Sequence, residues 1–276
     1  MNRTMLSWGL ITDVGRVRKV NQDAVSANGS LFVVADGMGG HQGGEEASRI
    51  AVGAISMAES VDSIEELKET VITANRLIRA KGAAVPELAG MGTTVVAMGV
   101  LPAELTDGSL HLGAANVGDS RLYRFEDGAL EQVSLDHSLV GELERAGQIT
   151  SAEAARHPQR NVVTRALGAD DDVEVDTWTI PARVGQRYLL CSDGLVNEVS
   201  DEQIRKELET VADPAEAAAN LCKAANLSGG RDNITILILD IHSDDSDSDD
   251  IASDDSDSDD SDSDDSASDD SASDDA

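Results

Sequence analysis

The sequence has few aromatic residues and few cysteines, and it contains no long apolar run. Of its 276 residues, only two each are Trp, Tyr and Phe, so the core must be built from Val, Leu, Ile and Ala. The longest apolar runs, such as residues 234–239, have the length of a strand, which excludes a membrane-spanning helix. Cys191 and Cys222 have neither a metal-ligand spacing nor a disulfide framework, and we expect both to be small buried apolar residues.

The N-terminus also lacks the features of a secretory signal. Residues 1–7 contain no basic region followed by a long apolar stretch. A cytoplasmic protein is therefore expected, since the scarcity of cysteine fits a reducing compartment as well.

Basic residues are scarce. Lys and Arg number 21 against 53 Asp and Glu, which gives a formal net charge of −32. Of the 53 acids, 17 are Asp residues within 243–276, which contain no base, so residues 1–242 carry 36 acids against 21 bases and a net charge of −15. Proteins bind nucleic-acid backbones through an excess of Lys and Arg, so nucleic acid is not expected as a partner.

The composition changes sharply after His242. Residues 243–276 are almost wholly Ser, Asp and Ala, in repeats such as SDSDD and SASDD. Like charges at this density, with Ile251 as the one large apolar residue, cannot bury enough surface to offset the entropy of folding. We expect a disordered acidic tail, which could keep the protein soluble, contact a basic partner, gather cations weakly or accept phosphate on its serines.

No Pro-, Gly- or Ser-rich linker divides residues 1–242, which are expected to form one domain. Apolar or alternating runs that end at turn residues predict strands at 8–12, 31–35, 93–101, 110–116, 121–125, 187–191 and 234–241. Helices are predicted at 44–59, 64–81, 201–210 and 214–225. Runs of adjacent strands exclude a regular alternation of strand and helix, and favour two mostly antiparallel sheets packed together with helices outside.

Four aspartates stand at or beside the ends of predicted strands: Asp36, Asp119, Asp193 and Asp232. Asp36, Asp119 and Asp193 each adjoin a glycine, and such a pair by itself is typical of an ordinary turn. Strand ends of packed sheets lie close together, however, so four such carboxylates could converge on one edge, where they would repel each other unless cations neutralised them. Oxygen ligands without His or Cys partners select Mg²⁺, Mn²⁺ or Ca²⁺ rather than zinc.

Two further stretches bear on phosphate chemistry. The Gly-rich residues 36–44 lack the spacing and the lysine of a nucleotide-binding loop. Residues 16–23 (RVRKVNQD) form an isolated positive patch, in which an arginine could hold a phosphate with two hydrogen bonds, although a solvated loop is the simpler interpretation of the patch alone. Cys191 is not expected as a nucleophile, because no C-x5-R phosphate loop follows it.

Taken in order, six motifs resemble those of the metal-dependent protein phosphatases, the type 2C serine/threonine phosphatases, in their compact bacterial form. The motifs are RxxNQD from Arg18, DGMGGH from Asp36, GTT from Gly92, VGDSR from Val117, LCSDG from Leu190 and GRDN from Gly230. The resemblance covers essentially all of residues 1–242. It implies an α+β fold, a four-layer α-β-β-α sandwich of two mostly antiparallel sheets, with a metal cluster at one edge.

The resemblance also implies a set of metal ligands. Asp36 would bridge two metals, and the carbonyl group of Gly37 would bind one of them. Asp193 and Asp232 would hold the second metal. Asp119, together with Asp193, matches the third and weaker metal position of the family.

Other residues are implied to act around the metals. Arg18 matches the arginine that binds the substrate phosphate, and Asp23 is expected behind the metal ligands, in the layer of groups that supports them. Gln22 stands where relatives often carry Glu, so the resemblance does not imply that this side chain contacts a metal directly. Met38 stands where many eukaryotic relatives carry a histidine proposed as general acid, so that His41 or a water is the candidate here.

The implied function is hydrolysis of phosphoserine and phosphothreonine in proteins by metal-activated water, without a covalent intermediate. Mn²⁺ or Mg²⁺ would serve, two ions bound tightly and a third more weakly. Residues 136–161 match the family's flap beside the active site, which tunes substrate access and the third metal. The substrates would be targets of serine/threonine kinases, or anti-sigma-type regulators, and a monomer is expected because the site needs no second subunit.

Two other functions stay open at this point. One is a non-catalytic, phosphatase-like module for signalling or binding. The other is an acidic, cation-binding scaffold whose main functional part is the tail. Neither should release phosphate catalytically.

Overall fold

The structure, a computed structural model, describes residues 4–39, 43–102 and 109–243. Its strands form two sheets in which neighbouring strands run antiparallel. The first sheet has the order β1-β11-β10-β7-β8, and these strands are β1 (Thr4–Asp13), β11 (Ile234–Ser243), β10 (Arg187–Cys191), β7 (Arg121–Glu126) and β8 (Ala129–Gln132).

The second sheet has the order β2-β3-β5-β6-β9, and a short β4 also pairs with β3. Its strands are β2 (Asp23–Ala27), β3 (Leu31–Met38), β4 (Gly92–Thr93), β5 (Val95–Leu101), β6 (His111–Val117) and β9 (Asp176–Pro181). The helices are α1 (Gly43–Ser56), α2 (Ile64–Ala84), α3 (Leu139–Arg145), α4 (Ser151–Ala154), α5 (Asp193–Val196), α6 (Asp201–Thr210) and α7 (Pro214–Ser228), with a 3-10 turn η1 (Pro86–Leu88).

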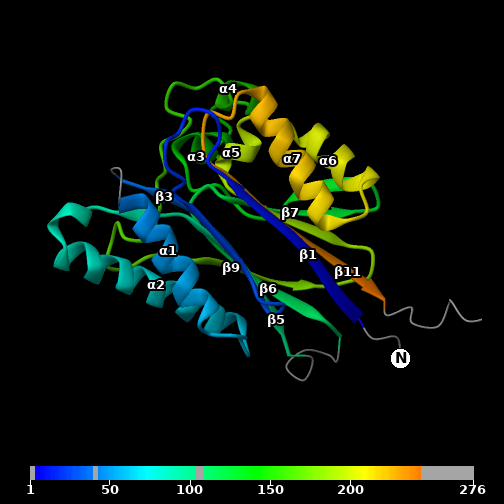
Figure 1. Cartoon of the computed structure of the whole chain (residues 1–276), viewed down its shortest axis with the longest axis horizontal. Helices are drawn as coiled ribbons and strands as arrows, with labels where there is room; N and C mark the ends of the chain where they lie inside the picture. The colour runs from blue at the N-terminus through cyan, green and yellow to red at the C-terminus, as the bar shows by residue number, and fades with distance from the viewer. Residues whose placement is uncertain (1–3, 40–42, 103–108, 244–276) are drawn as a thin grey trace, which may run out of the picture. The chain divides into compact units, whose positions relative to one another are not determined.

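Three buried clusters hold the layers together. Side chains of both sheets, among them Phe32 and Val96 from one and Leu190 and Leu237 from the other, meet in the cluster between the sheets. A second cluster lies between α1, α2 and the outer face of the β3 sheet, and a third lies between α6, α7 and the outer face of the β11 sheet. The order is therefore helices, sheet, sheet, helices (Figure 1), which confirms the predicted α-β-β-α sandwich.

The best predicted elements are those with a strong local signal. β11 lies in the interior of its sheet, and residues 234–239 are all buried, as expected for a strand covered on both faces. α6 covers the predicted residues 201–210, and its start is set by a capping box between Ser200 and Gln203. β10 likewise spans the predicted residues 187–191.

Several elements differ from the prediction. The strand predicted at 93–101 is divided at Thr94, where the chain turns from β4 to β5. The edge strands β2 and β9 were not predicted, because both are short and contain few fully buried residues. Asp193, expected in a turn, is the first residue of the short helix α5.

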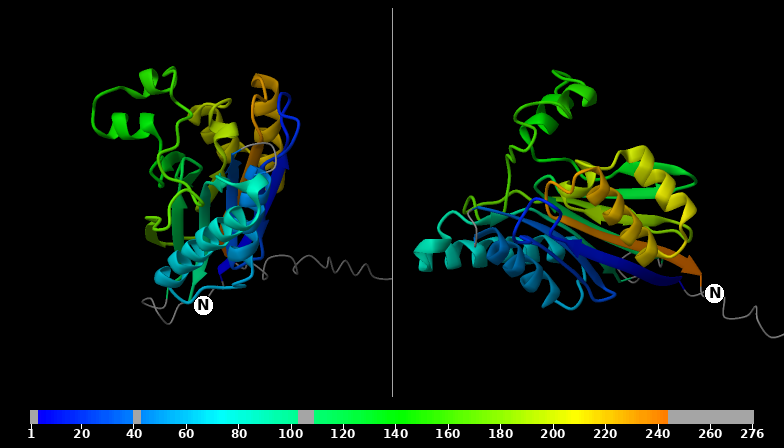
Figure 2. Two further views of the ribbon diagram at one scale, coloured as in Figure 1. Left: turned by 90° about the vertical axis from the view of Figure 1, so that its left-hand side faces the viewer. Right: turned by 45° about the horizontal axis from the view of Figure 1, so that its top comes forward.

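The flap prediction falls on a segment with little regular structure. Residues 136–161 contain only the short helices α3 and α4, and Figure 2 shows both standing out from the two sheets. Most of the segment is exposed, as its polar composition predicts.

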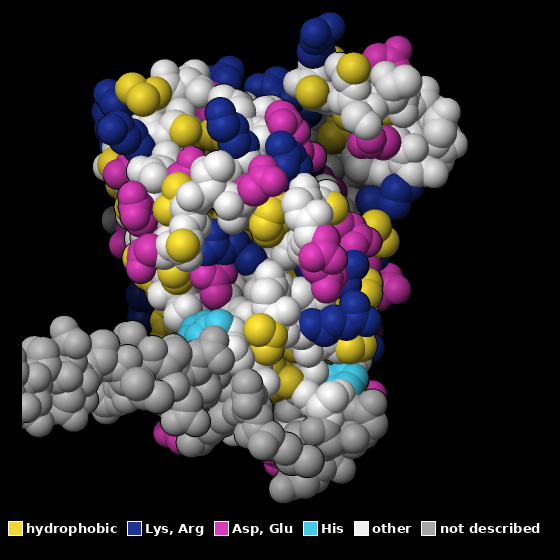
Figure 3. Space-filling model, turned by 90° about the vertical axis from the view of Figure 1, so that its right-hand side faces the viewer, with side chains coloured by type: hydrophobic (Ala, Val, Ile, Leu, Met, Phe, Trp, Pro, Cys, Tyr) yellow, Lys and Arg dark blue, Asp and Glu magenta, His cyan; other side chains and the backbone are white. Residues whose placement is uncertain are grey.

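The surface is mixed in charge on the face drawn in Figure 3, where acidic and basic side chains lie among one another. No helix in the described ranges is long and apolar enough to cross a membrane.

β11 extends through Ser243, which pairs with Thr4, one residue past the predicted end of the domain at His242. The predicted disorder of the tail falls on residues that the structure does not describe and stays a prediction.

Candidate metal centre

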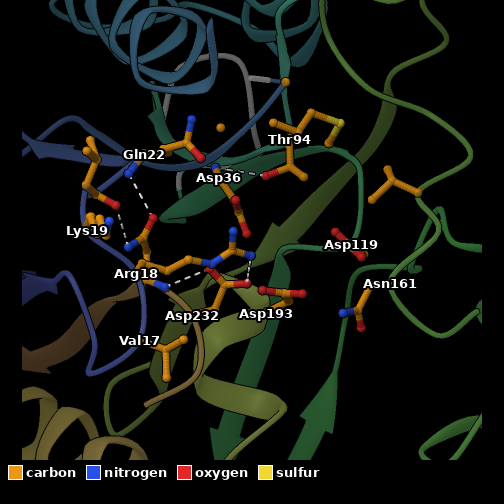
Figure 4. Close-up of a pocket in the computed structure, with 16 residues that line it drawn as sticks. Val17, Arg18, Lys19, Gln22, Asp36, Thr94, Asp119, Asn161, Asp193 and Asp232 are labelled. Atoms are coloured by element: carbon orange, nitrogen blue, oxygen red, sulfur yellow. Dashed lines mark hydrogen bonds and ion pairs between the residues drawn. The ribbon is translucent and has the colours of Figure 1, made fainter. Parts of the chain in front are cut away.

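The structure brings the four strand-end aspartates to one cavity of about 620 Å³. Asp36 lies in β3, Asp119 follows β6, Asp193 begins the helix after β10, and Asp232 precedes β11. Two of these strands belong to each sheet, so the cavity opens at the edge where the two sheets meet. Figure 4 shows the four carboxylates facing the same space.

The backbone of Asp36 is held by the two threonines of the GTT motif. The amide of Asp36 donates to Thr94 Oγ1 over 3.0 Å, and its carbonyl group accepts from the Thr94 amide over 2.8 Å and from Thr93 Oγ1 over 2.9 Å. Thr94 Oγ1 is also bonded to Ser120 Oγ over 2.7 Å. The motif was part of the sequence resemblance, but the pattern alone assigned it no role.

Gly37 is required by close packing rather than by an unusual backbone angle. A Cβ atom at this position would overlap the carbonyl oxygens of Gly44 and Gln22. The start of α1 and the Gln22 backbone therefore lie directly against Gly37. The amide of Gly37 donates to the Gln22 carbonyl group over 3.2 Å, which joins the end of β3 to the loop that carries Arg18.

Arg18 reaches into the cavity and pairs with one of the aspartates. Its Nη2 atom lies 2.7 Å from Asp232 Oδ2, and the bond is drawn in Figure 4. This hydrogen bond is the main cause of a raised Arg18 pKa, and the carboxylates of Asp36 and Asp193 add to it.

The loop that carries Arg18 is fastened by a residue whose role sequence reasoning missed. Asn233 is buried, and its Nδ2 atom donates to the carbonyl oxygens of Val14 over 2.9 Å and Val20 over 3.0 Å. Its Oδ1 atom accepts from the Gln22 amide over 2.8 Å. Asn233 stands in the GRDN motif, which was visible in the sequence, but its partners are more than 200 residues away.

Burial and neighbouring charges raise the pKa values of Asp36, Asp119 and Asp193. Burial is the largest cause for Asp36, whose pKa lies well above its ordinary value, and the charges of Asp23, Asp193 and Asp119 follow. Burial and then the charge of Asp193 raise the pKa of Asp119 to about 7. Burial and then the charge of Asp232 raise the pKa of Asp193. The cavity therefore holds more negative charge than Arg18 alone can offset.

Asp23 lies behind this group of carboxylates. It pairs with Asp36 across β2 and β3, and its Oδ2 atom accepts from Ser192 Oγ over 2.8 Å. Its Oδ1 atom is buried and has no hydrogen-bond partner among the described residues. Burial raises the pKa of Asp23 to about 7.

The turn that carries Asp119 is tied to the base of the flap through His137. The Gly118 amide donates to His137 Nδ1 over 3.0 Å, and the His137 amide donates to the Gly118 carbonyl group over 2.9 Å. The same imidazole lies 3.2 Å from Asp176 Oδ2 and 3.0 Å from Arg165 Nη1. Thr164, three residues past the C-terminal end of the flap, donates its amide to the His137 carbonyl group over 2.8 Å. The N-terminal end of the flap is thus joined to the Asp119 turn, and the chain just past its C-terminal end is joined to His137.

The residues present fit hard divalent cations. Among the described residues that line the cavity, none is His or Cys, and the charged oxygen donors are aspartates. As they stand, however, no three acidic, histidine or cysteine side chains of the described ranges converge closely enough to enclose one ion. Asp232 is turned towards Arg18 instead, and the other carboxylates repel each other.

Two other predictions concern reactive groups. His41 lies outside the described residues, so its distance from the aspartates stays open. Cys191 is fully buried, and burial raises the pKa of its thiol to about 12, which agrees with the expectation that it is not a nucleophile.

The sequence profile of the protein phosphatase 2C family matches residues 15–228. Among characterised proteins, the chain is similar to the serine/threonine phosphatase stp of Listeria monocytogenes. The two are 38% identical over 246 residues, which cover 83% of this chain and 93% of the relative.

Solved structures show the same similarity. The serine/threonine phosphatase PstP of Mycobacterium tuberculosis matches with a TM-score of 0.80 and 38% identity, over 86% of this chain and 99% of that one. The catalytic domain of PstP in complex with two manganese ions matches with a TM-score of 0.78 and 38% identity, over 87% of this chain and 100% of that one.

Proposed function

The chain belongs to the protein phosphatase 2C family and is a metal-dependent serine/threonine protein phosphatase, and we propose that the aspartates of the cavity are its metal ligands. The observation that carries this proposal is the meeting of Asp36, Asp119, Asp193 and Asp232 in one cavity beside Arg18. These residues come from both sheets and from distant parts of the chain.

The enzyme uses divalent cations. Asp36, the Gly37 carbonyl group, Asp193 and Asp232 are proposed to hold two of them, Mn²⁺ or Mg²⁺, as the PstP domain holds two manganese ions. Bound cations supply positive charge to the anionic phosphate and activate a water as the nucleophile. The raised pKa values of Asp36 and Asp193 support this assignment, because their burial and mutual repulsion are what cations would offset.

Arg18 is proposed to bind the substrate phosphate. Its guanidinium group is half-exposed at the cavity, and its loop is fastened by Asn233 and by the bond from the Arg16 amide to the Gly230 carbonyl group over 2.7 Å. A guanidinium group on a fixed loop can bind two phosphate oxygens at little cost in entropy. Its bond to Asp232 uses one of the five guanidinium N–H groups, and a cation held by Asp232 would weaken that bond.

Protonation of the leaving serine or threonine oxygen is assigned to His41 or to a water. The two can be separated with substrates that differ in leaving group. A His41→Gln variant that loses turnover of phosphothreonine but keeps that of an activated aryl phosphate would support His41, because only the alkoxide needs a proton in the transition state. Equal turnover of both substrates in this variant and in the native enzyme would favour the water.

Asp119 is proposed to hold a third, weaker cation together with Asp193. The contacts of His137 support a link between this position and the flap, because the imidazole accepts from the Gly118 amide and the His137 carbonyl group accepts from the amide of Thr164, just past residues 136–161. Movement of the flap would therefore shift the Asp119 carboxylate.

The substrates are phosphoproteins. We propose that they are targets of serine/threonine kinases, that the enzyme acts as a monomer, and that it works in the cytoplasm. The tail is proposed as a solvating segment that could also contact basic partners. The non-catalytic module and the acidic scaffold are not favoured, since the relatives are named as phosphatases.

The test is phosphate release from a phosphothreonine peptide with EDTA, Mg²⁺ or Mn²⁺, beside the Asp232→Ala variant. Release that requires an added cation and disappears in the variant is expected. Absence of release with every cation, from folded protein that still binds cations, would contradict the proposal and revive the non-catalytic module.

A further inference from the structure

The mouth of the catalytic cavity carries exposed valines next to the phosphate-binding arginine. Val17 is 65% exposed and Val20 is 40% exposed, and both line the cavity. Val163, two residues past the C-terminal end of the flap, lines it as well. We call Val17, Val20 and Val163 the valine rim. Figure 4 shows Val17 beside Arg18, and Asn161 of the flap on the other side of the aspartates.

The valine rim is held in place by the backbone. Asn233 bonds the carbonyl groups on both sides of Val17, at Val14 and Val20. Val163 pairs with Ser138 in an isolated antiparallel bridge. The valines are therefore presented to water by an anchored backbone, and an apolar ligand that covers them would gain the free energy of removing that surface from water.

The cavity has room for more than a phosphate. Its volume of about 620 Å³ lies in the range of pockets that enclose drug-sized ligands. A phosphorylated threonine side chain would fill only part of it. Residues of an extended peptide follow each other at about 3.3 Å, so a side chain one or two positions from the phosphorylated residue comes within reach of Val17 when the phosphate lies against Arg18.

We propose that the valine rim selects phosphoprotein segments with an apolar side chain next to the phosphorylated residue. This inference rests on the proposed function, since it requires the phosphate to lie at Arg18. The occupant is an aliphatic side chain of the substrate, and the contact favours catalysis on such segments over segments with polar neighbours. Val17 acts here on specificity and does not touch the reacting atoms.

The test compares two phosphothreonine peptides that differ only in the residues on either side of the phosphothreonine, Leu in one and Asn in the other. The native enzyme should show a kcat/KM about fivefold to tenfold higher for the Leu peptide, as expected from partial burial of one aliphatic side chain. Val17→Asn should lower the ratio, and Val17→Leu should keep it at the native value. The ratio compares two substrates on one preparation, so it does not depend on metal loading or on the folded fraction.

Val184 provides the matched control. It is 57% exposed in the turn between β9 and β10 and does not line the cavity. Val184→Asn should keep the native ratio. Equal kcat/KM for the two peptides in the native enzyme, or a ratio that Val17→Asn leaves unchanged, would overturn the inference while leaving the phosphatase assignment intact. Failure to release phosphate from both peptides with every cation would instead overturn the proposed function.

Discussion

The guanidinium group of Arg18 lies 2.7 Å from the carboxylate of Asp232, although 213 residues separate them in the chain. The pair joins the proposed phosphate ligand to a proposed metal ligand. Because the Arg18 side chain is half-exposed, the ion pair contributes little to the free energy of unfolding. The pair matters because it holds the two groups next to each other. The pair uses one of the five N–H groups of Arg18 and one oxygen of Asp232, so a phosphate at Arg18 and a cation at Asp232 would each weaken it.

Replacement of Arg18 should weaken binding of the substrate phosphate. We expect Arg18→Ala to raise KM for a phosphothreonine peptide about tenfold to hundredfold, the loss of charge-assisted hydrogen bonds to phosphate. Arg18→Lys should recover part of this loss, because a lysine keeps the charge but not the two-point geometry. Steady-state kinetics at saturating Mn²⁺ measure the effect. Arg183→Ala, in an exposed turn, is the control, and an unchanged KM in Arg18→Ala would refute the assignment.

The aspartates should differ in importance. Asp193→Ala should abolish metal-supported turnover while leaving the fold largely intact, since Asp193 is shared between proposed metal positions. Asp119→Ala should lower activity more mildly and leave tight binding of Mn²⁺ nearly unchanged. Calorimetric titration with Mn²⁺, circular dichroism and phosphate release provide the three readouts. Near-normal rates in Asp193→Ala, or loss of tight binding and fold together in Asp119→Ala, would show that these assignments are wrong.

The stability of the metal-free protein should fall as the pH rises. Asp23 and Asp119 have folded-state pKa values of about 7, above the value of about 3.9 for an unfolded aspartate. Between these values the folded chain binds more protons than the unfolded chain, so the free energy of unfolding decreases with increasing pH. Bound cations would offset this loss by neutralising the carboxylates.

Thermal unfolding at pH 6 and pH 8, with EDTA or Mn²⁺, would measure the effect. The increase in Tm produced by Mn²⁺ should be larger at pH 8 than at pH 6. Asp119→Asn should reduce the pH dependence in EDTA, since it removes one of the titrating groups. An increase in Tm from Mn²⁺ that is equal or smaller at pH 8 than at pH 6 would contradict the expectation.

Loss of the Asn233 side chain should loosen the loop that carries Arg18. Asn233→Ala leaves the carbonyl groups of Val14 and Val20 and the Gln22 amide without their partner, at a cost of about 1–3 kcal/mol in the free energy of unfolding. It should also raise KM for the peptide. Asn28→Ala removes a similar set of turn hydrogen bonds at the other end of β2 and should destabilise the fold without changing KM. Equal KM effects in both variants would argue against a role for Asn233 in positioning the loop.

Removal of residues 244–276 should leave turnover of a small phosphoester within about twofold of the native rate. Ser243 ends the ten-residue strand β11, and Asp232 precedes its start, so Ser243 lies about 33 Å along the strand from the cavity. Phosphate release at saturating Mn²⁺ by the truncated and full chains makes the comparison. A large loss of turnover in the truncated chain would assign the tail a catalytic or metal-supplying role.

The sequence by itself determined the local structure and the chemistry of the site. The apolar run of β11 and the capping box of α6 predict their elements from neighbouring residues. The motifs around Asp36 and Asp193 also predicted oxygen ligands for hard cations. These signals depend on neighbouring residues only, so they are visible in the sequence whatever the position of the segment in the fold.

Only the tertiary structure decided how these parts meet. The edge strand β9 pairs with β6, about 60 residues earlier in the chain, and β2 forms a hairpin with β3 without a fully buried residue of its own, so their own residues predict both strands weakly. The hydrogen bonds of Asn233 and the ion pair of Arg18 join residues more than 200 positions apart. The raised pKa of Asp36 arises from burial and from charges on other parts of the chain. Such contacts depend on the packing of the two sheets, which brings together groups that no local pattern relates.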